Sequence, residues 1–333
     1  MKPKVLLVTT GGTISMERDA SGVLVPCRGA EQLLSRVPEV RTLADVDVES
    51  LANLDSADVE PSLWGRLAEA ISRRLADYDG FVVTHGTDTL VYTAAALSFM
   101  LQELGKPVVL TGAQVPLEDI GSDGRANLIN AVRLATADFA EVAVVFGSVI
   151  MRGTRAKKTS AFDLQAFRSA NVPALGTIGL SLKLSTDVRR RARRTAVLQT
   201  ALEPHVALLP VYPGLSPAVL TYLCETHAGV VLEGYGAGNL PSAGPLSLVP
   251  AIRAATARGV SVVVCTQCLV GSTEMELYQV GKAALEAGAI PVMDMTPETA
   301  LVKLMWVLGQ APSTSDVKAR MQQAFAGELH VSG

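Results

Sequence analysis

Thr13 is the residue best placed to act as a nucleophile in this 333-residue chain. It follows Gly11-Gly12 directly after the apolar, β-branched segment 5–10, a pattern typical of a strand that ends in a sharp turn. Open α/β sheets bind their ligands outside the carboxyl ends of the strands. The glycines do not fit a dinucleotide fingerprint, because neither a third glycine nor a helical pattern follows them. A lone threonine in a turn more often bonds nearby backbone, so its interpretation depends on the residues around it.

Thr87, Asp88 and Lys158 have the chemistry that a threonine nucleophile needs. A threonine hydroxyl is weakly nucleophilic at its ordinary pKa, and a base or a neighbouring cation must favour its ionised form. Lys158 can do this if Asp88 holds it and Thr87 relays the proton, which is the logic of a Ser-His-Asp triad with other residue types. Together with Thr13, these residues predict acyl transfer by a threonine.

Further polar clusters follow other predicted strands. Asp55-Ser56 follows the segment 47–54, and Gly112-Ala113 follows the segment 107–111. The residues 152–158 follow the segment 141–146. The carboxyl ends of parallel strands share one edge of a sheet, so we expect all these clusters to converge. Backbone N–H groups of the 11–13 and 112–113 loops are then candidates for an oxyanion hole.

Each cluster also has a purely structural interpretation. Asp55-Ser56 can cap the helix after Pro61, and Thr87 or Asp88 can cap the next helix. Lys158 can be one more surface lysine. Capping explains each loop alone but not five loops on one edge, so the sequence favours an enzyme.

Strands and helices alternate through residues 5–146. This alternation predicts an α/β fold in which a mainly parallel sheet is flanked by helices, as an N-terminal catalytic domain over residues 1–186. Asp123 is the expected N-cap of the third helix. The predicted strands are 5–10, 47–54, 80–84, 107–111 and 141–146, and the predicted helices are 61–76, 89–104 and 125–137.

A dense basic run at 187–194 interrupts this pattern. Charge runs are usually solvated, so we expect an exposed linker over 187–204 and no contact with nucleic acid. The β/α alternation then resumes and predicts a smaller C-terminal parallel α/β domain over 205–333. Its predicted strands are 205–210, 230–233, 260–265 and 290–293, with helices at 217–225, 246–258, 275–287 and 296–309.

The composition excludes several classes of function. A net charge of −3 gives no basic footprint for nucleic acid, and the apolar runs are too short to span a bilayer. The N-terminal apolar stretch has only the length of a strand and leads into the Gly-Gly turn, which is not typical of a signal peptide. We therefore expect a cytoplasmic protein without a membrane partner.

The four cysteines fit that compartment. Cys27 and Cys224 are isolated, and Cys265-Thr-Gln-Cys268 is a single C-x-x-C motif. No histidine lies within ligand spacing of it, so we expect no metal and no cofactor. The motif does not open a typical redox helix, and we expect buried structural thiols.

Taken together, the motifs resemble the bacterial-type L-asparaginase family. The resemblance rests on Thr10-Gly-Gly-Thr-Ile, Asp55-Ser56, Thr84-His-Gly-Thr-Asp-Thr89 and Lys158. In the second half, Tyr235-Gly-Ala-Gly-Asn239 and Thr266-Gln-Cys268 are similar to the cytosolic, type I branch.

The resemblance implies hydrolysis of L-asparagine to L-aspartate and ammonia through a threonine acyl-enzyme. It implies Thr13 as nucleophile, with Thr87, Asp88 and Lys158 as the second catalytic group. Lys158 is preferred to its neighbour because the family lysine stands nine positions before a phenylalanine, here Phe167. It also implies a homodimer or a homotetramer built as a dimer of dimers. The implied substrate-binding residues are Asp55, Ser56, Thr87, Asp88 and Ala113.

Three positions depart from the family pattern. Val23 follows Gly22 where the family usually has a tyrosine, so water, a partner-subunit residue or the Lys158 triad are alternatives for activating Thr13. Ala57 replaces a glutamine that contacts substrate in secreted members. Glu233 stands where some cytosolic relatives have an arginine at a regulatory asparagine site. A carboxylate there repels the effector's carboxylate, so we expect hyperbolic kinetics.

Two other function classes stay open. A related amidotransferase subunit shares the threonine, aspartate and lysine set and supplies ammonia to a tRNA-modifying partner, but it carries an extra N-terminal domain that we do not expect here. A non-catalytic asparagine sensor is the second alternative. Ammonia release from asparagine without tRNA or ATP distinguishes a hydrolase from both.

Overall fold

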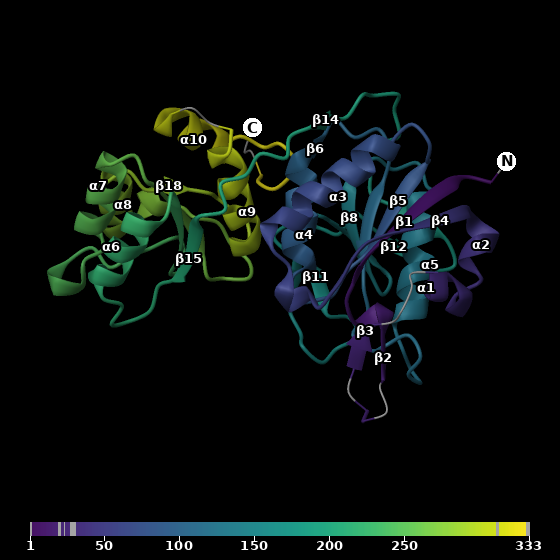
Figure 1. Cartoon of the computed structure of the whole chain (residues 1–333). Coiled ribbons are helices and arrows are strands. Elements are labelled where there is room, and N and C mark those ends of the chain that lie inside the picture. Colours follow the sequence, from purple (N-terminus) through teal and green to yellow (C-terminus); the bar gives the residue numbers. More distant parts are fainter. Residues whose placement is uncertain (1, 19–20, 23, 27–30, 311–312, 331–333) are drawn as a thin grey trace. The chain divides into compact units, whose positions relative to one another are not determined.

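The computed structural model describes residues 2–18, 21–22, 24–26, 31–310 and 313–330. The chain folds into two compact units, Met1–Thr200 and Ala201–Gly333 (Figure 1). Of the helices in the described part, none combines the length and the apolar character that a bilayer crossing needs.

An eight-stranded sheet lies at the centre of the first unit, in the order β13-β12-β9-β8-β7-β5-β1-β4. The five strands β4, β1, β5, β7 and β8 are parallel, which confirms the mainly parallel sheet predicted from the alternating pattern. The strands are β1 (Lys4–Gly11), β4 (Asp45–Leu54), β5 (Gly80–Thr84), β7 (Val108–Thr111), β8 (Val142–Phe146), β9 (Val149–Arg152), β12 (Gly176–Ile178) and β13 (Leu182–Leu184).

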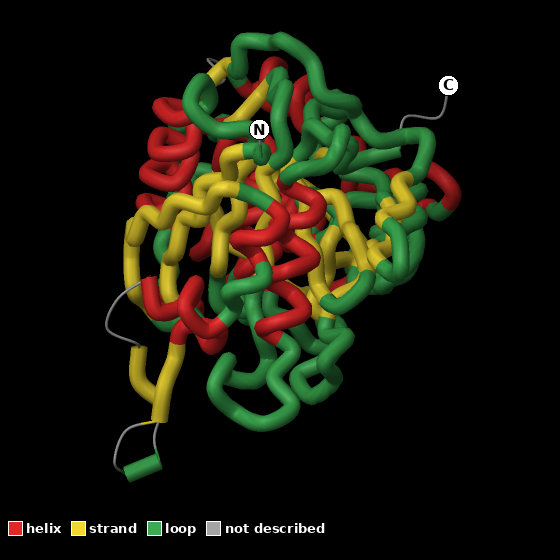
Figure 2. The backbone as a smooth tube through the Cα atoms, turned by 90° about the vertical axis from the view of Figure 1, so that its right-hand side faces the viewer, coloured by secondary structure: helices red, strands yellow, loops and turns green. Residues whose placement is uncertain are grey.

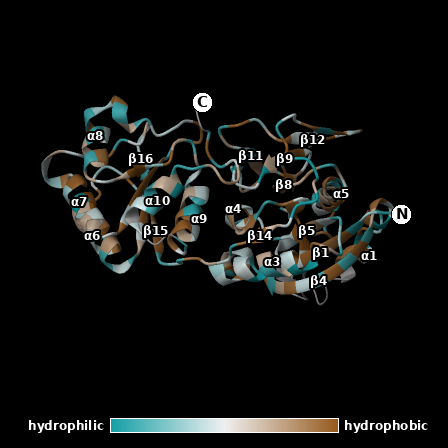
Figure 3. Ribbon diagram, turned by 90° about the horizontal axis from the view of Figure 1, so that it is seen from above, coloured by the Kyte–Doolittle hydropathy of each residue, from teal (hydrophilic) through white to brown (hydrophobic). Residues whose placement is uncertain are grey.

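Helices cover both faces of this sheet, which explains why its central strands are apolar on both sides. On β1, Val5 and Leu7 belong to the apolar cluster that includes Leu128 of α5, while Leu6 and Val8 are buried on the other face. Figure 3 shows the apolar strands inside and polar residues on the outer helices. The helices are α1 (Glu31–Arg36), α2 (Val40–Leu43), α3 (Pro61–Arg74), α4 (Leu90–Met100) and α5 (Gly124–Ala135).

Short elements complete the first unit. The hairpin of β2 (Met16–Arg18) and β3 (Leu24–Pro26) projects from its body directly after the 3-10 helix η1 (Thr13–Ser15) (Figure 2). A second 3-10 helix, η2 (Ser56–Asp58), follows β4. Two further strand pairs are antiparallel: β10 (Ala156–Lys158) with β11 (Phe167–Ser169), and β6 (Leu101–Gln102) with β14 (Val197–Leu198).

The chain after β8 differs from the expected loop. Gly147, at φ +58°, allows a tight turn into β9, which runs antiparallel to β8 and returns to the start of that strand. Arg152 therefore pairs with Ala143 and donates to the Glu141 carboxylate at 2.7 Å, at the opposite edge from the carboxyl ends. The interpretation of 152–158 as one cluster after the fifth strand is wrong for Arg152, whereas β10 brings Lys158 back.

The second unit is a smaller parallel α/β unit, as predicted. Its four strands are all parallel, in the order β15-β16-β17-β18. Leu220, Ile252 and Ala284 place α6, α7 and α8 on one apolar face, and α9 packs on the other (Figure 1). The strands are β15 (Val206–Pro210), β16 (Gly229–Gly234), β17 (Ser261–Thr266) and β18 (Ile290–Pro291), and the helices are α6 (Pro217–Thr226), η3 (Gly244–Leu246), α7 (Val249–Ala257), η4 (Met275–Leu277), α8 (Gln279–Glu286), α9 (Pro297–Leu308) and α10 (Thr314–Met321).

Most residues of the basic run at 187–194 are exposed, as expected, but two of them attach it to the first unit. Val188 is buried, and the Arg191 guanidinium donates to the carbonyls of Asp79, Ala135 and Ala137 at 2.5–2.8 Å. Two of these carbonyls lie at and just beyond the end of α5, where helix carbonyls lack intrahelical partners. The run is therefore bound to the first unit, which ends at Thr200.

Candidate active site

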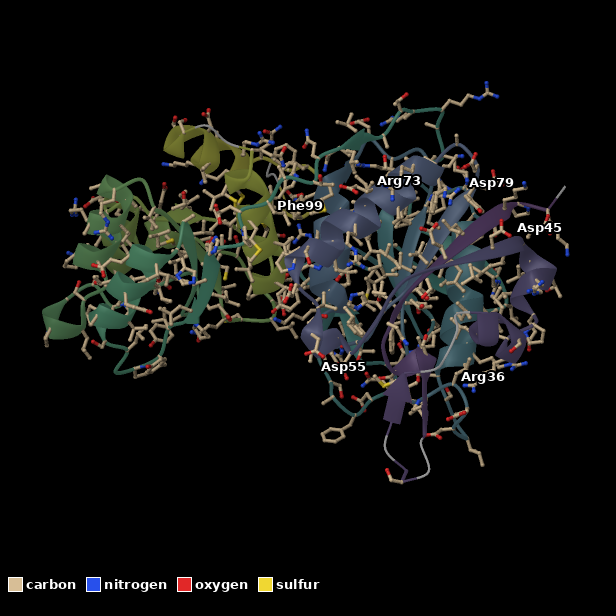
Figure 4. All side chains as sticks on the ribbon, in the orientation of Figure 1. Arg36, Asp45, Asp55, Arg73, Asp79 and Phe99 are labelled. Atoms are coloured by element: carbon tan, nitrogen blue, oxygen red, sulfur yellow. The ribbon has the colours of Figure 1, made fainter. Side chains whose placement is uncertain are left out.

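Four loops meet at the carboxyl edge of the first sheet. Figure 4 shows Asp55 at this edge, with Asp45 and Asp79 at the opposite one. A methyl group on Gly12 would lie 2.3 Å from the Gly86 nitrogen, and one on Gly86 would lie 2.5 Å from the Ser56 Cβ. A methyl group on Gly112 would lie 2.3 Å from the His85 carbonyl oxygen. The glycines therefore let the loops after β1, β5 and β7 pack backbone against backbone, and let the Ser56 side chain of the loop after β4 pack on Gly86.

Thr13 is half-buried and begins η1. Gly12, at φ +81°, makes the turn from β1 into this helix, and its N–H donates to the Leu54 carbonyl at 3.0 Å. The Thr10 hydroxyl holds the end of β1 against β5 by donating to the Thr84 carbonyl at 3.0 Å. Of the oxyanion-hole candidates in this loop, the Gly12 N–H is thus already bound to Leu54.

Thr87, Asp88 and Lys158 form one hydrogen-bonded cluster. The Lys158 ammonium donates to the Thr87 hydroxyl at 2.8 Å and to the Asp88 carboxylate at 2.6 Å. The Asp88 side chain is 65 % exposed and that of Lys158 is 20 % exposed, whereas Thr87 is buried. The pairing of Lys158 with Phe167 in β10 and β11 sets this position. The Asp88 carboxylate is therefore the more accessible of the two groups that Lys158 binds.

Ser56 links the loops after β4 and β5. Its buried hydroxyl accepts from the Asp88 N–H at 3.3 Å, and its carbonyl accepts from the Thr89 hydroxyl at 2.7 Å. Asp55 is exposed, and its carboxylate caps η2 by accepting from the Ala57 N–H at 2.9 Å. The capping alternative thus applies to Asp55, although it caps η2 and not α3.

The capping alternative fails for the loop after β5. The N-cap of α4 is Thr89, which makes no side-chain capping bond; its hydroxyl donates to the Ser56 carbonyl. The Asp88 carboxylate does not cap the helix either, and is bound to Lys158. Asp123 does stand at the N-cap of α5, but its carboxylate accepts from the N–H groups of Gln114 and Val115 at 3.0–3.1 Å. Asp123 therefore holds the loop after β7.

Two buried residues at this edge were missed by sequence reasoning. Asn127, on α5, makes hydrogen bonds to the loops after β7 and β8. The sequence pattern that could have indicated it is an asparagine one helical turn after Asp123. His85 is buried, with Nδ1 at 2.8 Å from the Gly86 carbonyl and Nε2 at 2.9 Å from the Thr93 hydroxyl. The carbonyl requires Nδ1 to carry the proton, and burial lowers the pKa of this imidazole.

The remaining sequence features lie partly outside the described residues. Val23 and Cys27 are among the positions that the structure does not describe. Cys224 and Cys265 are buried free thiols, as expected, but the expectation is wrong for Cys268, which is exposed. In the described ranges, no group of three or more His, Cys, Asp or Glu side chains is arranged to hold a metal ion.

The fold and the site define a two-unit α/β protein with a Thr-Asp-Lys cluster at the carboxyl edge of its larger sheet. The chain belongs to the asparaginase family. Residues 4–190 match the model described as "Asparaginase, N-terminal", and residues 205–321 match the "Glutaminase/Asparaginase C-terminal domain". These matches confirm the resemblance found in the motifs.

Similar proteins of known name include amidotransferase subunits and asparaginases. The chain is 39 % identical to a subunit of the glutamyl-tRNA(Gln) amidotransferase of Pyrococcus horikoshii, over 98 % of this chain and 77 % of that protein. It is 36 % identical to L-asparaginase 1 of Escherichia coli, over 98 % of each. The solved structure of the thermostable L-asparaginase from Thermococcus kodakarensis superposes with a TM-score of 0.93 at 37 % identity, over 99 % of this chain and 100 % of that one.

Proposed function

We propose that this protein is an asparaginase that hydrolyses the side-chain amide of L-asparagine to L-aspartate and ammonia. The observation that carries the proposal is that the Lys158 ammonium binds both Thr87 and Asp88. The loop that contains Thr87 and Asp88 packs against the loop of Thr13 through Gly86 and Gly12. A hydroxyl and a cation-supported second hydroxyl are the groups that threonine acyl transfer requires. The membership of the asparaginase family supports the substrate.

The proposed reaction begins at Thr13. Its hydroxyl oxygen bonds to the amide carbon, and its proton passes through Thr87 to the amide nitrogen, which leaves as ammonia. Water then attacks the Thr13 ester, releases aspartate and returns the proton to the threonine. The Lys158 ammonium stabilises negative charge that develops on Thr87 during each transfer.

The substrate's charged ends need matching groups beside this centre. The exposed Asp88 carboxylate suits the α-ammonium group, and the Ser56 hydroxyl suits the α-carboxylate, with the backbone of Asp55 and Ala113 nearby. The Thr13 and Ala113 N–H groups are the proposed oxyanion donors, because the Gly12 N–H is bound to Leu54. No cofactor enters this scheme.

The decisive experiment measures ammonia released from L-asparagine by the pure protein without tRNA or ATP. We expect steady release by the natural protein, none by Thr13→Ala, and a loss of about 100-fold or more in kcat for Thr87→Val. Near-normal release by Thr13→Ala would move the nucleophile to Thr87. Binding of asparagine without any ammonia would favour the sensor.

A second candidate is an ammonia-supplying component of a tRNA-dependent amidotransferase. The 39 % identity to the amidotransferase subunit of Pyrococcus horikoshii favours it. Such a component should release ammonia efficiently only with its partner and charged tRNA present. Full activity of the isolated chain would exclude this role as the main one.

We further propose a cytoplasmic homodimer or homotetramer with no nucleic-acid or membrane partner. Val270, Leu277 and Tyr278 are large apolar side chains of the second unit that are more than half exposed, and side chains of this kind favour association with another protein surface where they form one patch. Light scattering coupled to gel filtration tests the assembly. A monomer at micromolar concentration would contradict it.

A further inference from the structure

Asn127 is a completely buried amide that joins two loops of the carboxyl edge. Its Nδ2 donates to the Gly112 carbonyl and to the Asp123 carboxylate, each at 2.9 Å. Its Oδ1 accepts from the Gly147 N–H at 2.8 Å. Both donors and the acceptor of the amide are therefore used, and the proposed hydrolysis assigns Asn127 no role.

The bond to Gly112 also determines where the next N–H group points. The Gly112 carbonyl and the Ala113 N–H belong to one planar trans peptide, so they point in opposite directions. With the carbonyl held by Asn127, the Ala113 N–H is directed away from α5. The following two N–H groups, of Gln114 and Val115, are bound by Asp123.

The Gly112-Ala113 peptide lies beside the proposed catalytic threonines. A methyl group on Gly112 would be 3.5 Å from the Thr87 Cγ2. Ala113 and Ile14, the neighbour of Thr13, both lie 3.2 Å from the position of a Cβ on Gly124. Among the described residues, the buried Ala113 N–H has no hydrogen-bond acceptor, and such a group is costly unless an acceptor arrives.

We propose that Asn127 is a positioning residue that orients the Gly112-Ala113 peptide, so that the Ala113 N–H can donate to the oxyanion. The inference rests on the proposed hydrolysis at Thr13. Asn127 does not touch the substrate. It acts by keeping a donor aimed at charge that exists only in the transition state.

The test is Asn127→Asp, which has nearly the same volume. The carboxylate keeps an acceptor for the Gly147 N–H but places an oxygen against the Gly112 carbonyl and the Asp123 carboxylate. We expect kcat to fall by about 10- to 100-fold, because a misdirected oxyanion donor should lower the rate less than the complete removal of one donor does. The KM for asparagine should change less than about threefold, because the neutral amide of the bound substrate carries no oxyanion.

Asn130→Asp is the matched control. Asn130 lies on the same helix and donates to the Gly147 carbonyl at 2.8 Å, in the loop after β8. We expect its kcat to stay within about twofold of the natural value. A parallel fall in kcat for both variants, or a fall that simply follows Tm, would overturn the positioning role.

The exchange Asp123→Asn/Asn127→Asp separates stability from positioning. It restores a donor and an acceptor between the two side chains but leaves the Gly112 carbonyl without its donor. We expect Tm to recover while kcat stays low, and recovery of both would refute the proposal.

A crystal structure of Asn127→Asp gives a readout that does not depend on activity. We expect a rotated Gly112-Ala113 peptide, and an unchanged one would overturn the inference. An inactive natural protein would instead refute the proposed hydrolysis, so the two failures are distinguishable.

Discussion

The Lys158 ammonium bridges the Thr87 hydroxyl oxygen, at 2.8 Å, and the Asp88 carboxylate, at 2.6 Å. The three residues come from two different parts of the chain, and Lys158 lies 70 positions after Asp88. Only the return of the chain through β10 brings the lysine to this edge. A hydroxyl that accepts from an ammonium is better able to carry negative charge. One cation therefore binds both the hydroxyl that we propose as proton relay and the carboxylate that we propose as a substrate contact.

Lys158→Met should lower kcat by about 100-fold or more, because Thr87 loses the charge that stabilises its ionised form. The neighbouring Lys157→Met is the matched control, since successive side chains of a strand point to opposite sides. Steady-state ammonia release by both variants checks this. Equal activity of the two would remove Lys158 from the mechanism.

His85 should make stability depend on pH. Burial lowers its pKa from 6.5 in the folded protein, so below pH 6.5 the unfolded chain binds a proton that the folded one does not. The free energy of unfolding should therefore fall as pH drops below 6.5, by up to about 1.4 kcal/mol per pH unit. His85→Asn keeps a donor for the Gly86 carbonyl but lacks this titration.

Urea unfolding of both proteins between pH 5 and pH 8 measures the effect. The natural protein should lose stability relative to His85→Asn on acidification. A pH-independent difference between the two would contradict a neutral imidazole in the folded state.

The sequence predicted the parallel part of the fold well, because β-branched runs alternate with helical periods there. The segment 80–84 coincides with β5. The antiparallel strands β9, β12 and β13 were missed because two of them have three residues and their pairing depends on partners elsewhere in the sheet. Periodicity cannot identify a strand of that length.

The candidate site was predicted from motifs, but its supporting residues were not. Thr13, Thr87 and Lys158 stand in patterns that carry chemistry. Asn127 is a single polar residue on a helix, and only its burial distinguishes it from a surface amide. Arg191 was taken for solvated charge because composition does not reveal that carbonyls at the end of a helix lie within its reach.

The pair of Lys303 and Glu328 should be essential to the second unit. Both side chains are completely buried, and Nζ lies 2.6 Å from the carboxylate. Lys303→Met leaves a buried charge without its partner, so it should lower the free energy of unfolding by about 3–5 kcal/mol. Urea unfolding checks this. Lys303→Met/Glu328→Gln should recover part of the loss, and no loss in the single variant would contradict the argument.

Cys268 should react with thiol reagents far faster than Cys224. Cys268 is exposed, whereas burial raises the pKa of the Cys224 thiol to about 11, and only the thiolate is nucleophilic. Iodoacetamide at pH 8, followed by mass spectrometry of the peptides, should find alkylation at Cys268 first. Equal rates at both positions in the folded protein would contradict the burial of Cys224.

Glu233 should prevent asparagine from binding as an activator of the enzyme beside the sheet of the second unit. It lies near the end of β16, where its carbonyl accepts from the Val211 N–H at 3.0 Å and from the Gln267 side chain at 2.8 Å. Its own carboxylate repels that of an amino-acid effector, where an arginine would form a bidentate pair. Binding that is not coupled between sites gives a hyperbolic velocity curve. Initial rates over a wide range of asparagine concentrations should therefore give a Hill coefficient of about 1. A sigmoidal curve would show that asparagine binds as an effector in spite of the Glu233 carboxylate.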